Sequence, residues 1–349
     1  MKRIFKVAAC LMACLSMFAL MSCGSKKASG LVGAGATFPL PYYNMAFDAY
    51  KSATGVSVNY GAQGSGTGIR SLADRLVDFA GSDAFLNDEE MKSMPAVIHV
   101  PTCLGAAVLA YNLPGVKDLR LTPQLLSDIY LGKLTMWSDP AIAAVNPDVK
   151  LPDIQIFPVY RSDGSGTTYV FSHYLSQVSS EWAQAVGAGK ALKWPVGMAA
   201  KGNPGVAGNI KQTEGAIGYI GSEYAFSARI PMALMQNAAG NFVYPSTESI
   251  SAAATGDIPA DTRVMITNSA APEAYPISCL TWILAYQEQS YDGRTIEQAM
   301  ALQDFLYWMI GKEAQDMTVK VHYAPLSADM ASKAKAQIRS MTFNGQPIQ

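Results

Sequence analysis

The chain has few of the side chains from which metal sites and disulfide frameworks are built. Its 349 residues include only three histidines, which are scattered along the chain, and no C-x-x-C motif. Metal-ligand clusters combine several such side chains at close spacing, so neither a metal ion nor a cofactor is expected. Of the five cysteines, only Cys103 and Cys279 lie beyond the amino-terminal region. They are read either as two buried free thiols or as one disulfide, because export would permit such a bond.

Long apolar runs are also absent beyond the amino terminus. Lys2, Arg3 and Lys6 precede an uncharged run from Val7 to Ser22, whose 16 residues fall short of the length of a membrane span, about 20 residues. A basic start followed by a short apolar run is the pattern of an export signal. No later run is long enough to cross a bilayer.

The export signal ends in Leu20-Met21-Ser22-Cys23, which resembles a bacterial lipobox. In such a signal the cysteine is lipidated and becomes the mature amino terminus, whereas the alternative is an ordinary secretory signal with an incidental cysteine. We therefore expect a lipoprotein signal peptide over residues 1–22, palmitate or a similar lipid on Cys23, and a tether over residues 23–30. The expected location is extracytoplasmic, anchored to the cell membrane on its periplasmic side.

The body of the protein has little charge of either sign. Without residues 1–22 the chain has 327 residues, with 23 basic against 27 acidic side chains and a formal charge of −4. At about 150 residues per domain this length suggests two domains. A net negative body without basic runs indicates no nucleic-acid partner, so any bound anion needs a local site.

Strand-like and helix-like segments alternate along the mature chain. Expected helices include one carrying Ile69, Leu72, Leu76 and Phe79 at helical spacing, one starting at Thr122-Pro123, and one over residues 167–178. The alternation predicts an α/β protein with mainly parallel sheets and helices on both faces. In such sheets ligands bind where strand ends lead into helices. The expected strands are residues 56–60, 97–100, 106–111, 154–160 and 216–220.

No linker separates two compact halves, because the Pro/Gly-rich stretch over residues 194–208 only interrupts the middle of the chain. We therefore expect a discontinuous arrangement in which the chain leaves one lobe, builds the second and returns. The expected lobe I comprises residues 31–105 plus 275–349, and lobe II comprises residues 106–274. Two extended segments, residues 101–107 and 275–281, are the expected two-stranded hinge.

Three glycine-rich segments precede helical patterns, and Ser-Gly-Thr occurs in two of them. Glycine lets the backbone approach a ligand, the first N–H groups of a helix lack internal partners, and Ser or Thr adds a hydroxyl donor. A serine or threonine before a helix usually caps the helix itself, but three such loops together favour an anion site. The segments are Gly33-Ala-Gly-Ala-Thr-Phe-Pro, Gly64-Ser-Gly-Thr-Gly and Gly164-Ser-Gly-Thr-Thr.

These loops do not match nucleotide-binding or hydrolytic motifs. The lysine of a phosphate-binding P-loop is absent, and the spacing differs from the dinucleotide pattern. The nucleophile elbow G-x-S-x-G fails at Ser65 and Ser165, and His173 lies about two helical turns from Ser165. Hydrolysis is therefore the weaker hypothesis.

Seven successive motifs, which together span essentially the whole mature chain, are similar to those of the phosphate-binding proteins of bacterial high-affinity phosphate ABC transporters. They are Gly33-Ala-Gly-Ala-Thr-Phe-Pro, Asn59-Tyr-Gly-Ala-Gln-Gly-Ser-Gly, Asp78-Phe-Ala-Gly-Ser-Asp-Ala, Ile129-Tyr-Leu-Gly-Lys, Arg161-Ser-Asp-Gly-Ser-Gly-Thr, Lys193-Trp-Pro-Val-Gly and Gly215-Ala-Ile-Gly-Tyr. The resemblance implies two α/β lobes of the type II-like periplasmic binding protein fold, joined by a two-stranded hinge. It also implies a monomeric, non-enzymatic receptor that delivers phosphate to a permease driven by a cytoplasmic ATPase.

The resemblance also implies a set of phosphate ligands by motif. Two departures from the family are Phe85, where proline is frequent, and Gly66, where serine is frequent. Thr67 is expected to supply the missing hydroxyl, and Asp163 is an expected partner of Arg161. The implied ligands are Thr37, Phe38 (through its backbone N–H), Ser65, Asp83, Arg161, Ser165, Gly166 and Thr167.

The chemistry of Asp83 and Arg161 agrees with this assignment. Phosphate near neutral pH carries a proton that a buried carboxylate can accept, whereas sulfate carries none and would set two acceptors against each other. Arg161 would supply a fixed charge and could pair with Asp83 or Asp163. Taken singly, Asp83 could instead cap a turn before Asn87, and Arg161 could be a solvated surface residue. The functional alternatives are a binder of another tetrahedral oxyanion or phosphorylated ligand, and a secreted phosphatase.

Overall fold

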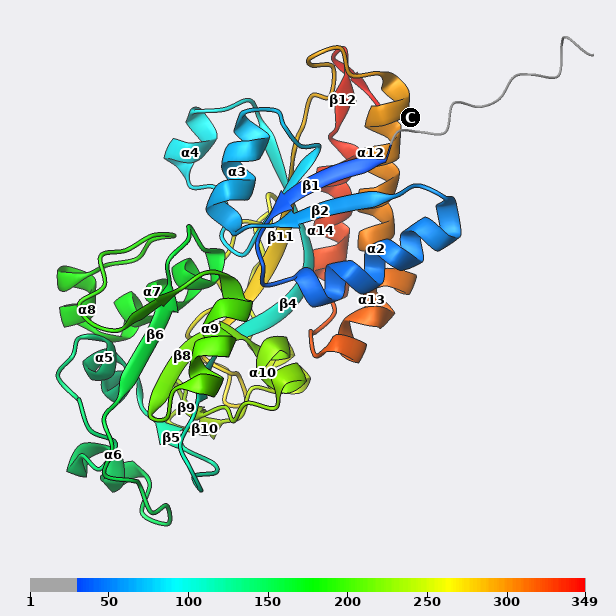
Figure 1. Cartoon of the computed structure of the whole chain (residues 1–349). Coiled ribbons are helices and arrows are strands. Elements are labelled where there is room, and N and C mark those ends of the chain that lie inside the picture. The colour runs from blue at the N-terminus through cyan, green and yellow to red at the C-terminus, as the bar shows by residue number, and fades with distance from the viewer. Residues whose placement is uncertain (1–29, 349) are drawn as a thin grey trace, which may run out of the picture.

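The computed structural model of the protein describes residues 30–348. The expected signal peptide, Cys23 and all of the expected tether except Gly30 lie outside the described residues. Figure 1 shows two groups of elements, with α2, α12 and α14 in one and α5 to α10 in the other, between which β4 and β11 pass. Within residues 30–348, no helix is both long enough and apolar enough to cross a membrane.

One eight-stranded sheet runs through both groups. Its pairings β1–β2, β1–β3, β6–β7 and β6–β8 are parallel, whereas the three antiparallel pairings all involve β4 or β11. The prediction of an α/β protein with mainly parallel strands is confirmed. In spatial order the strands are β2 (Val58–Ala62), β1 (Leu31–Gly35), β3 (Phe79–Ser82), β11 (Ser278–Tyr286), β4 (Val97–Tyr111), β8 (Ala216–Gly221), β6 (Phe157–Arg161) and β7 (Met198–Ala200).

The long strand β4 corrects one expectation from the sequence. Residues 97–100 and 106–111, which we expected as two strands, belong to a single buried strand of 15 residues. Pro101 has no N–H to donate, and the strand accommodates it at a register shift opposite Thr281 and Trp282. Beyond that shift Cys103 to Ala106 pair with Ser278 to Thr281, so the two expected hinge segments lie side by side. Cys103 and Cys279 are buried free thiols.

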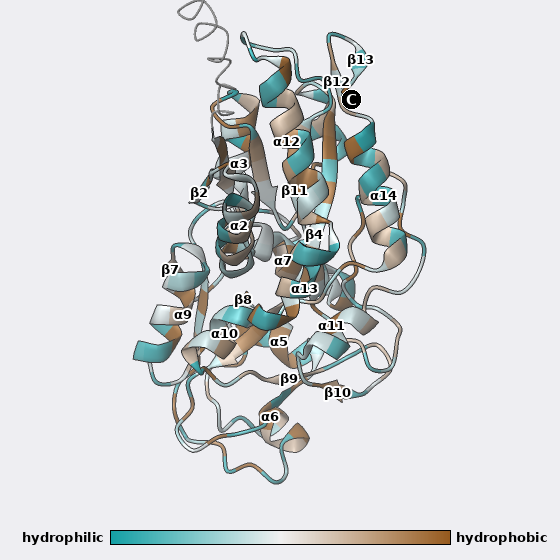
Figure 2. Ribbon diagram, turned by 90° about the vertical axis from the view of Figure 1, so that its right-hand side faces the viewer, coloured by the Kyte–Doolittle hydropathy of each residue, from teal (hydrophilic) through white to brown (hydrophobic). Residues whose placement is uncertain are grey.

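The helices lie on both sides of the sheet. In Figure 2, α2 and α3 lie on one side of β4 and β11, and α14 lies on the other. Short sheets join β10 (Phe242–Val243) to β9 (Leu234–Gln236) and β5 (Arg120–Leu121), and β12 (Thr342–Phe343) to β13 (Gln346–Pro347). The helices are α2 (Leu40–Thr54), α3 (Ser65–Ala73), α4 (Asp88–Lys92), α5 (Pro123–Tyr130), α6 (Pro140–Val145), α7 (Gly166–Val178), α8 (Ser180–Ala185), α9 (Gly202–Gln212), α10 (Ser222–Ala228), α11 (Thr247–Ala252), α12 (Ile296–Met309), α13 (Lys312–Thr318), the 3-10 turn η1 (Val319–Val321) and α14 (Ala328–Arg339).

Two helix predictions have opposite outcomes. Helix α5 begins as predicted, with Pro123 in its first turn and the Thr122 hydroxyl accepting a hydrogen bond from Leu125 N at 3.2 Å. The helix expected to include Leu76 and Phe79 is wrong beyond Ala73, because Arg75 has a left-handed backbone (φ 56°) that ends it. Leu76 is 72% exposed, and Phe79 opens strand β3.

The carboxyl-terminal helix α12 packs through aromatic contacts onto the amino-terminal part of the chain. The Phe305 ring lies 5.2 Å from Phe47, 5.3 Å from Tyr50 and 5.4 Å from Phe79 between centroids. Along α12 and α14, teal and brown segments alternate in Figure 2, as expected of helices with one buried face. The two ends of the chain therefore build one core.

Candidate anion-binding site

Four strand-to-helix loops meet near the middle of the sheet. Thr37 and Phe38 connect β1 to α2, Ser65 starts α3 after β2, and Gly166 starts α7 after β6. A fourth helix, α9, starts at Gly202 directly after β7. Unpaired backbone N–H groups and the positive end of the helix dipole make such helix starts favourable for anions.

The two Ser-Gly-Thr loops contact each other directly. Gly66 N donates to Gly164 O at 2.9 Å, and Gly166 N donates to Ser65 Oγ at 3.0 Å. A Cβ on Gly166 would stand 2.6 Å from Ser65 Oγ and 2.7 Å from the backbone N of Asp83, which cannot easily move, so this approach favours glycine. The repeated sequence therefore places two helix starts against each other.

Asp83 follows β3 and is 1% exposed. Its Oδ1 accepts a hydrogen bond from Thr281 Oγ1 at 2.9 Å, and its Oδ2 accepts one from Thr167 Oγ1 at 3.1 Å. Burial raises the pKa of Asp83 to about 6, although these hydroxyls and the charge of Arg161 oppose the rise. The capping role that we considered for Asp83 belongs to Asn87, whose side chain caps α4 in a capping box with Glu90.

Arg161 is buried, with 1% of its side chain exposed, and its charge partner is Asp163. Its Nε and Nη2 donate to the two carboxylate oxygens of Asp163 at 2.8 and 2.5 Å, while Nη1 lies 3.5 Å from Thr167 Oγ1. Burial alone would raise the pKa of Asp163, but its hydrogen bonds with Arg161 and with Gly202 N lower it below the ordinary value. The fork leaves Arg161 fixed in orientation rather than solvated.

Asn203 is a buried residue of this cluster that sequence reasoning missed. Its backbone N and its Nδ2 both donate to Thr37 Oγ1, at 3.1 and 3.0 Å, and Nδ2 lies 3.4 Å from Thr167 Oγ1. Thr37 O accepts a further hydrogen bond from Tyr224 OH at 2.5 Å. The available signal was Lys201-Gly-Asn-Pro, a glycine followed by a polar residue at a helix start, inside the stretch that we read only as an interruption.

The structure brings most of the expected ligands together but places Thr67 apart. Thr67 Oγ1 accepts a hydrogen bond from Arg70 Nη2 at 3.2 Å in an exposed setting, so its hydroxyl is directed along α3. Phe38 is buried, and its carbonyl oxygen accepts a hydrogen bond from Tyr323 OH at 2.5 Å. Ser165 Oγ caps α7 by accepting from Thr168 N at 3.0 Å, which leaves its hydroxyl hydrogen free to donate elsewhere.

The groups that a hydrolase would need are arranged differently. His173 Nδ1 is hydrogen bonded to Thr267 Oγ1 at 3.0 Å, and Ser165 Oγ serves the helix start. In the part of the chain that the structure describes, no group of three or more His, Cys, Asp or Glu side chains is placed to hold a metal ion.

A second buried carboxyl, Glu223, lies in the first turn of α10. It is 1% exposed, and neither of its carboxylate oxygens accepts a hydrogen bond, since the neighbouring Tyr323 hydroxyl donates to Phe38 O. Burial, followed by the negative charge of Asp83, raises the pKa of Glu223 well above its ordinary value. A raised folded-state pKa means that stability is lost as pH rises above the unfolded-state value.

Replacement of Glu223 by glutamine is therefore expected to stabilise the ligand-free protein more at pH 8 than at pH 5. The gain arises from removal of the buried negative charge, which is favoured more at pH 8 than at pH 5. Thermal unfolding at both pH values measures it, with the exposed Glu273→Gln as the matched control. Equal changes at the two pH values would contradict this explanation.

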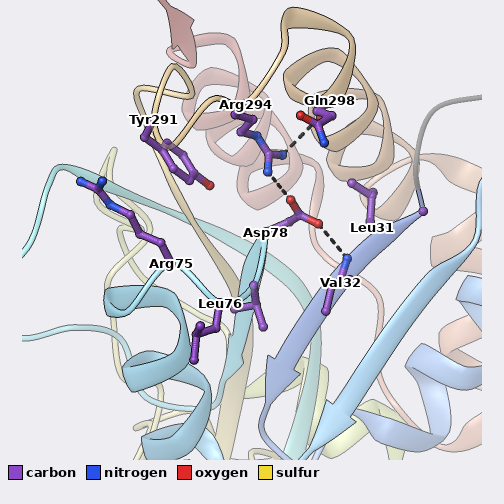
Figure 3. Close-up of a pocket in the computed structure, with 10 residues that line it drawn as sticks. Leu31, Val32, Arg75, Leu76, Asp78, Tyr291, Arg294 and Gln298 are labelled. Atoms are coloured by element: carbon purple, nitrogen blue, oxygen red, sulfur yellow. Dashed lines mark hydrogen bonds and ion pairs between the residues drawn. The ribbon is translucent and has the colours of Figure 1, made fainter. Parts of the chain in front are cut away.

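A separate cavity of about 250 Å³ lies at the opposite end of β1. Figure 3 shows Arg294 in it, paired with Asp78, whose other oxygen accepts a hydrogen bond from Val32 N at 2.7 Å. Arg75, the second arginine of the cavity, is paired with Asp292 at 2.7 Å. Both arginines of this cavity are thus paired with a carboxylate, as Arg161 is with Asp163.

Comparisons with known proteins show which family the chain resembles. A family model described as PBP superfamily domain matches residues 23–313. Phosphate-binding protein PstS of Xylella fastidiosa (strain 9a5c) is 39% identical over 315 residues, which cover 89% of this chain and 85% of that relative. Phosphate-binding protein PstS of Methanocaldococcus jannaschii is 35% identical over 320 residues, which cover 85% of this chain and 82% of that relative.

Solved structures show the same fold at lower identity. The high-affinity periplasmic phosphate-binding protein PfluDING bound with phosphate has a TM-score of 0.69 at 21% identity, covering 88% of this chain and 93% of that chain. The phosphate binding protein of Stenotrophomonas maltophilia has a TM-score of 0.66 at 20% identity, covering 88% and 94%. On the family match and the identity to these relatives, the chain belongs to the PBP superfamily and, within it, to the family of phosphate-binding proteins.

Proposed function

We propose that the protein captures inorganic phosphate between two lobes and delivers it to the permease of an ABC transporter. The observation that carries this proposal is that a buried acceptor, Asp83, and a buried cation, Arg161, which Asp163 holds in orientation, occur together among four helix starts. Such an arrangement holds an anion and also accepts a hydrogen bond from it, which suits phosphate because phosphate carries a hydrogen near neutral pH. The names of the relatives support the same ligand.

In this proposal lobe I comprises residues 31–105 plus 275–349, lobe II comprises residues 106–274, and β4 with β11 is the hinge. The hydrogen bonds Ser65–Gly166, Gly66–Gly164 and Thr37–Asn203 would then all join one lobe to the other. The described conformation is accordingly the closed one. Opening would rotate the lobes about the paired segments of β4 and β11, and phosphate would favour the closed state by differential binding.

The proposed ligand groups are mainly neutral donors. Hydroxyls of Thr37, Ser65 and Ser165 and the backbone N–H of Phe38 would surround the anion, with Arg161 as the cation and Asp83 as the hydrogen-bond acceptor. Gly166 N–H and the Thr167 hydroxyl, which donate to Ser65 Oγ and Asp83 Oδ2 in the described conformation, would redirect these hydrogen bonds to the anion when it binds. Arg161, Asp163 and Asp83 together carry a formal charge of −1, so N–H and O–H dipoles and the helix starts must compensate the anion.

Export and anchoring complete the proposal. The signal over residues 1–22 and the lipobox cysteine Cys23 support a lipoprotein on the periplasmic side of the membrane. The receptor acts as a monomer that catalyses no reaction and docks on the permease subunits, whose cytoplasmic ATPase drives import.

We expect the protein to bind phosphate without hydrolysing phosphate esters. Equilibrium dialysis with radioactive orthophosphate should show one phosphate per chain, whereas p-nitrophenyl phosphate should yield no nitrophenol above a protein-free control. Turnover abolished by Ser165→Ala would instead support the secreted phosphatase, and absence of any phosphate binding would refute the receptor.

A further inference from the structure

Asn203 occupies a position that the implied ligand set leaves without a role. Asn203 is the second residue of α9 and is fully buried. Its Nδ2 contacts a hydroxyl from each side of the cluster, Thr37 Oγ1 and Thr167 Oγ1. The distances to Thr37 are the shorter ones, 3.1 Å from the backbone N and 3.0 Å from Nδ2. Thr37 thus receives two N–H donors from one residue.

The count of donors and acceptors at Thr37 Oγ1 determines which way its hydrogen points. A threonine hydroxyl has one hydrogen to donate and two lone pairs to accept with. The two N–H groups of Asn203 fill both lone pairs, so the hydroxyl can take part in a further hydrogen bond only by donating its hydrogen. An anion bound beside Thr37 would accept this hydrogen.

The orientation of the Asn203 amide is fixed by its other end. Asn203 Oδ1 accepts a hydrogen bond from Gly221 N at 3.0 Å, so a flip of the amide would set Nδ2 against the Gly221 N–H, donor against donor, and lose this bond. Gly202, with φ 69°, holds the start of α9 close to Thr37, and its N–H donates to Asp163 Oδ1 at 2.9 Å. The same helix start therefore also supports the partner of Arg161.

We infer that Asn203 is a positioning residue of the phosphate site, which fixes the Thr37 hydroxyl as a donor to the anion when the lobes close. This inference rests on the proposed function. Thr37 lies in lobe I and Asn203 in lobe II, so their hydrogen bonds exist only in the closed protein. Loss of Asn203 should consequently act on phosphate release more than on phosphate capture.

The test measures phosphate affinity and dissociation rate for a set of variants of the otherwise unchanged chain. Asn203→Ala should weaken phosphate binding about tenfold, the size of one buried hydrogen bond, mostly through faster dissociation. Asn203→Asp should weaken it further, because its carboxylate competes for the Thr37 hydrogen and repels the anion. Asn209→Ala on the same helix is the matched control and should bind like the parent chain.

A double-mutant cycle separates positioning from a direct contact. If Asn203 acts through Thr37, Asn203→Ala should add little to the loss caused by Thr37→Val. Additive losses, parental affinity of Asn203→Ala, or Asn203→Asp binding as well as the parent would each overturn the inference.

If thermal unfolding shows that Asn203→Ala does not fold, Asn203→Asp, which retains the shape and the bond to Gly221, carries the test alone. Phosphate binding by the parent chain with no effect at Asn203 overturns only this inference, whereas a parent chain that does not bind phosphate overturns the proposed function as well.

Discussion

Replacement of Arg161 by methionine is expected to lower phosphate affinity more than a hundredfold. The substitution removes the buried cation and leaves Asp163, which Arg161 holds through two hydrogen bonds, as an unpaired carboxylate beside the anion. Removing a buried, hydrogen-bonded charge from a binding surface costs about 2 to 5 kcal/mol of binding free energy, and about 1.4 kcal/mol corresponds to a factor of ten. Isothermal titration calorimetry with phosphate measures the change.

The surface substitution Arg339→Met at the end of α14 is the matched control for Arg161→Met. It removes the same charge from an exposed position and should leave phosphate affinity unchanged. Circular dichroism should show native secondary structure in both variants. If the phosphate affinity of Arg161→Met stayed within threefold of the parent value, Arg161 would not be a phosphate ligand.

Replacement of Asp83 by asparagine is expected to reduce the preference for phosphate over sulfate about a hundredfold. Ionised Asp83 accepts a hydrogen bond from a phosphate hydroxyl, whereas sulfate has no hydrogen to donate and sets its own acceptor oxygen against the carboxylate. Asparagine can donate to either anion, so most of the change should be a gain in sulfate affinity. Ser65→Ala, which removes a hydroxyl donor instead, should weaken both anions alike. If Asp83→Asn, like Ser65→Ala, changed the phosphate and sulfate affinities by the same factor, Asp83 would not be the group that distinguishes the protonated anion from the unprotonated one.

The pH dependence of sulfate binding is a second test of whether the protonation state of Asp83 controls anion preference. Because burial raises the pKa of Asp83 to about 6, the carboxyl is mostly ionised at pH 8 and mostly protonated at pH 5. A protonated Asp83 can donate to sulfate, so sulfate affinity of the parent chain should increase as pH falls through about 6. The Asp83→Asn variant should lose this dependence, and an unchanged dependence in the variant would assign it to another group.

The order of strands and helices could largely be predicted from the sequence, because period-two and helical patterns are local. The capped start of α5, helix α7 and strand β8 lie where Thr122-Pro123, residues 167–178 and residues 216–220 indicated. One error arose where long-range pairing decides, because β4 continues through Pro101 where β11 and β8 pair with it. The other is local, because α3 stops before Leu76 where Arg75 adopts a left-handed backbone.

The residues around the candidate site were predicted only in part, because local patterns are visible in the sequence and contacts between distant loops are not. Glycine-rich helix starts are visible in sequence, and they identified the loops at Thr37, Ser65 and Ser165. The choice of Asp163 over Asp83 as the partner of Arg161, and the contribution of Asn203, depend on which loops meet across the sheet. Neither can be read from one strand-to-helix segment alone.

Parallel calorimetric titrations of the parent chain with phosphate and sulfate at pH 8 test the central claim most directly. We expect saturable binding of one phosphate per chain, and sulfate binding at least a hundredfold weaker, because only phosphate brings a proton to Asp83. Equal affinity for the two anions, or binding of neither, would contradict the account.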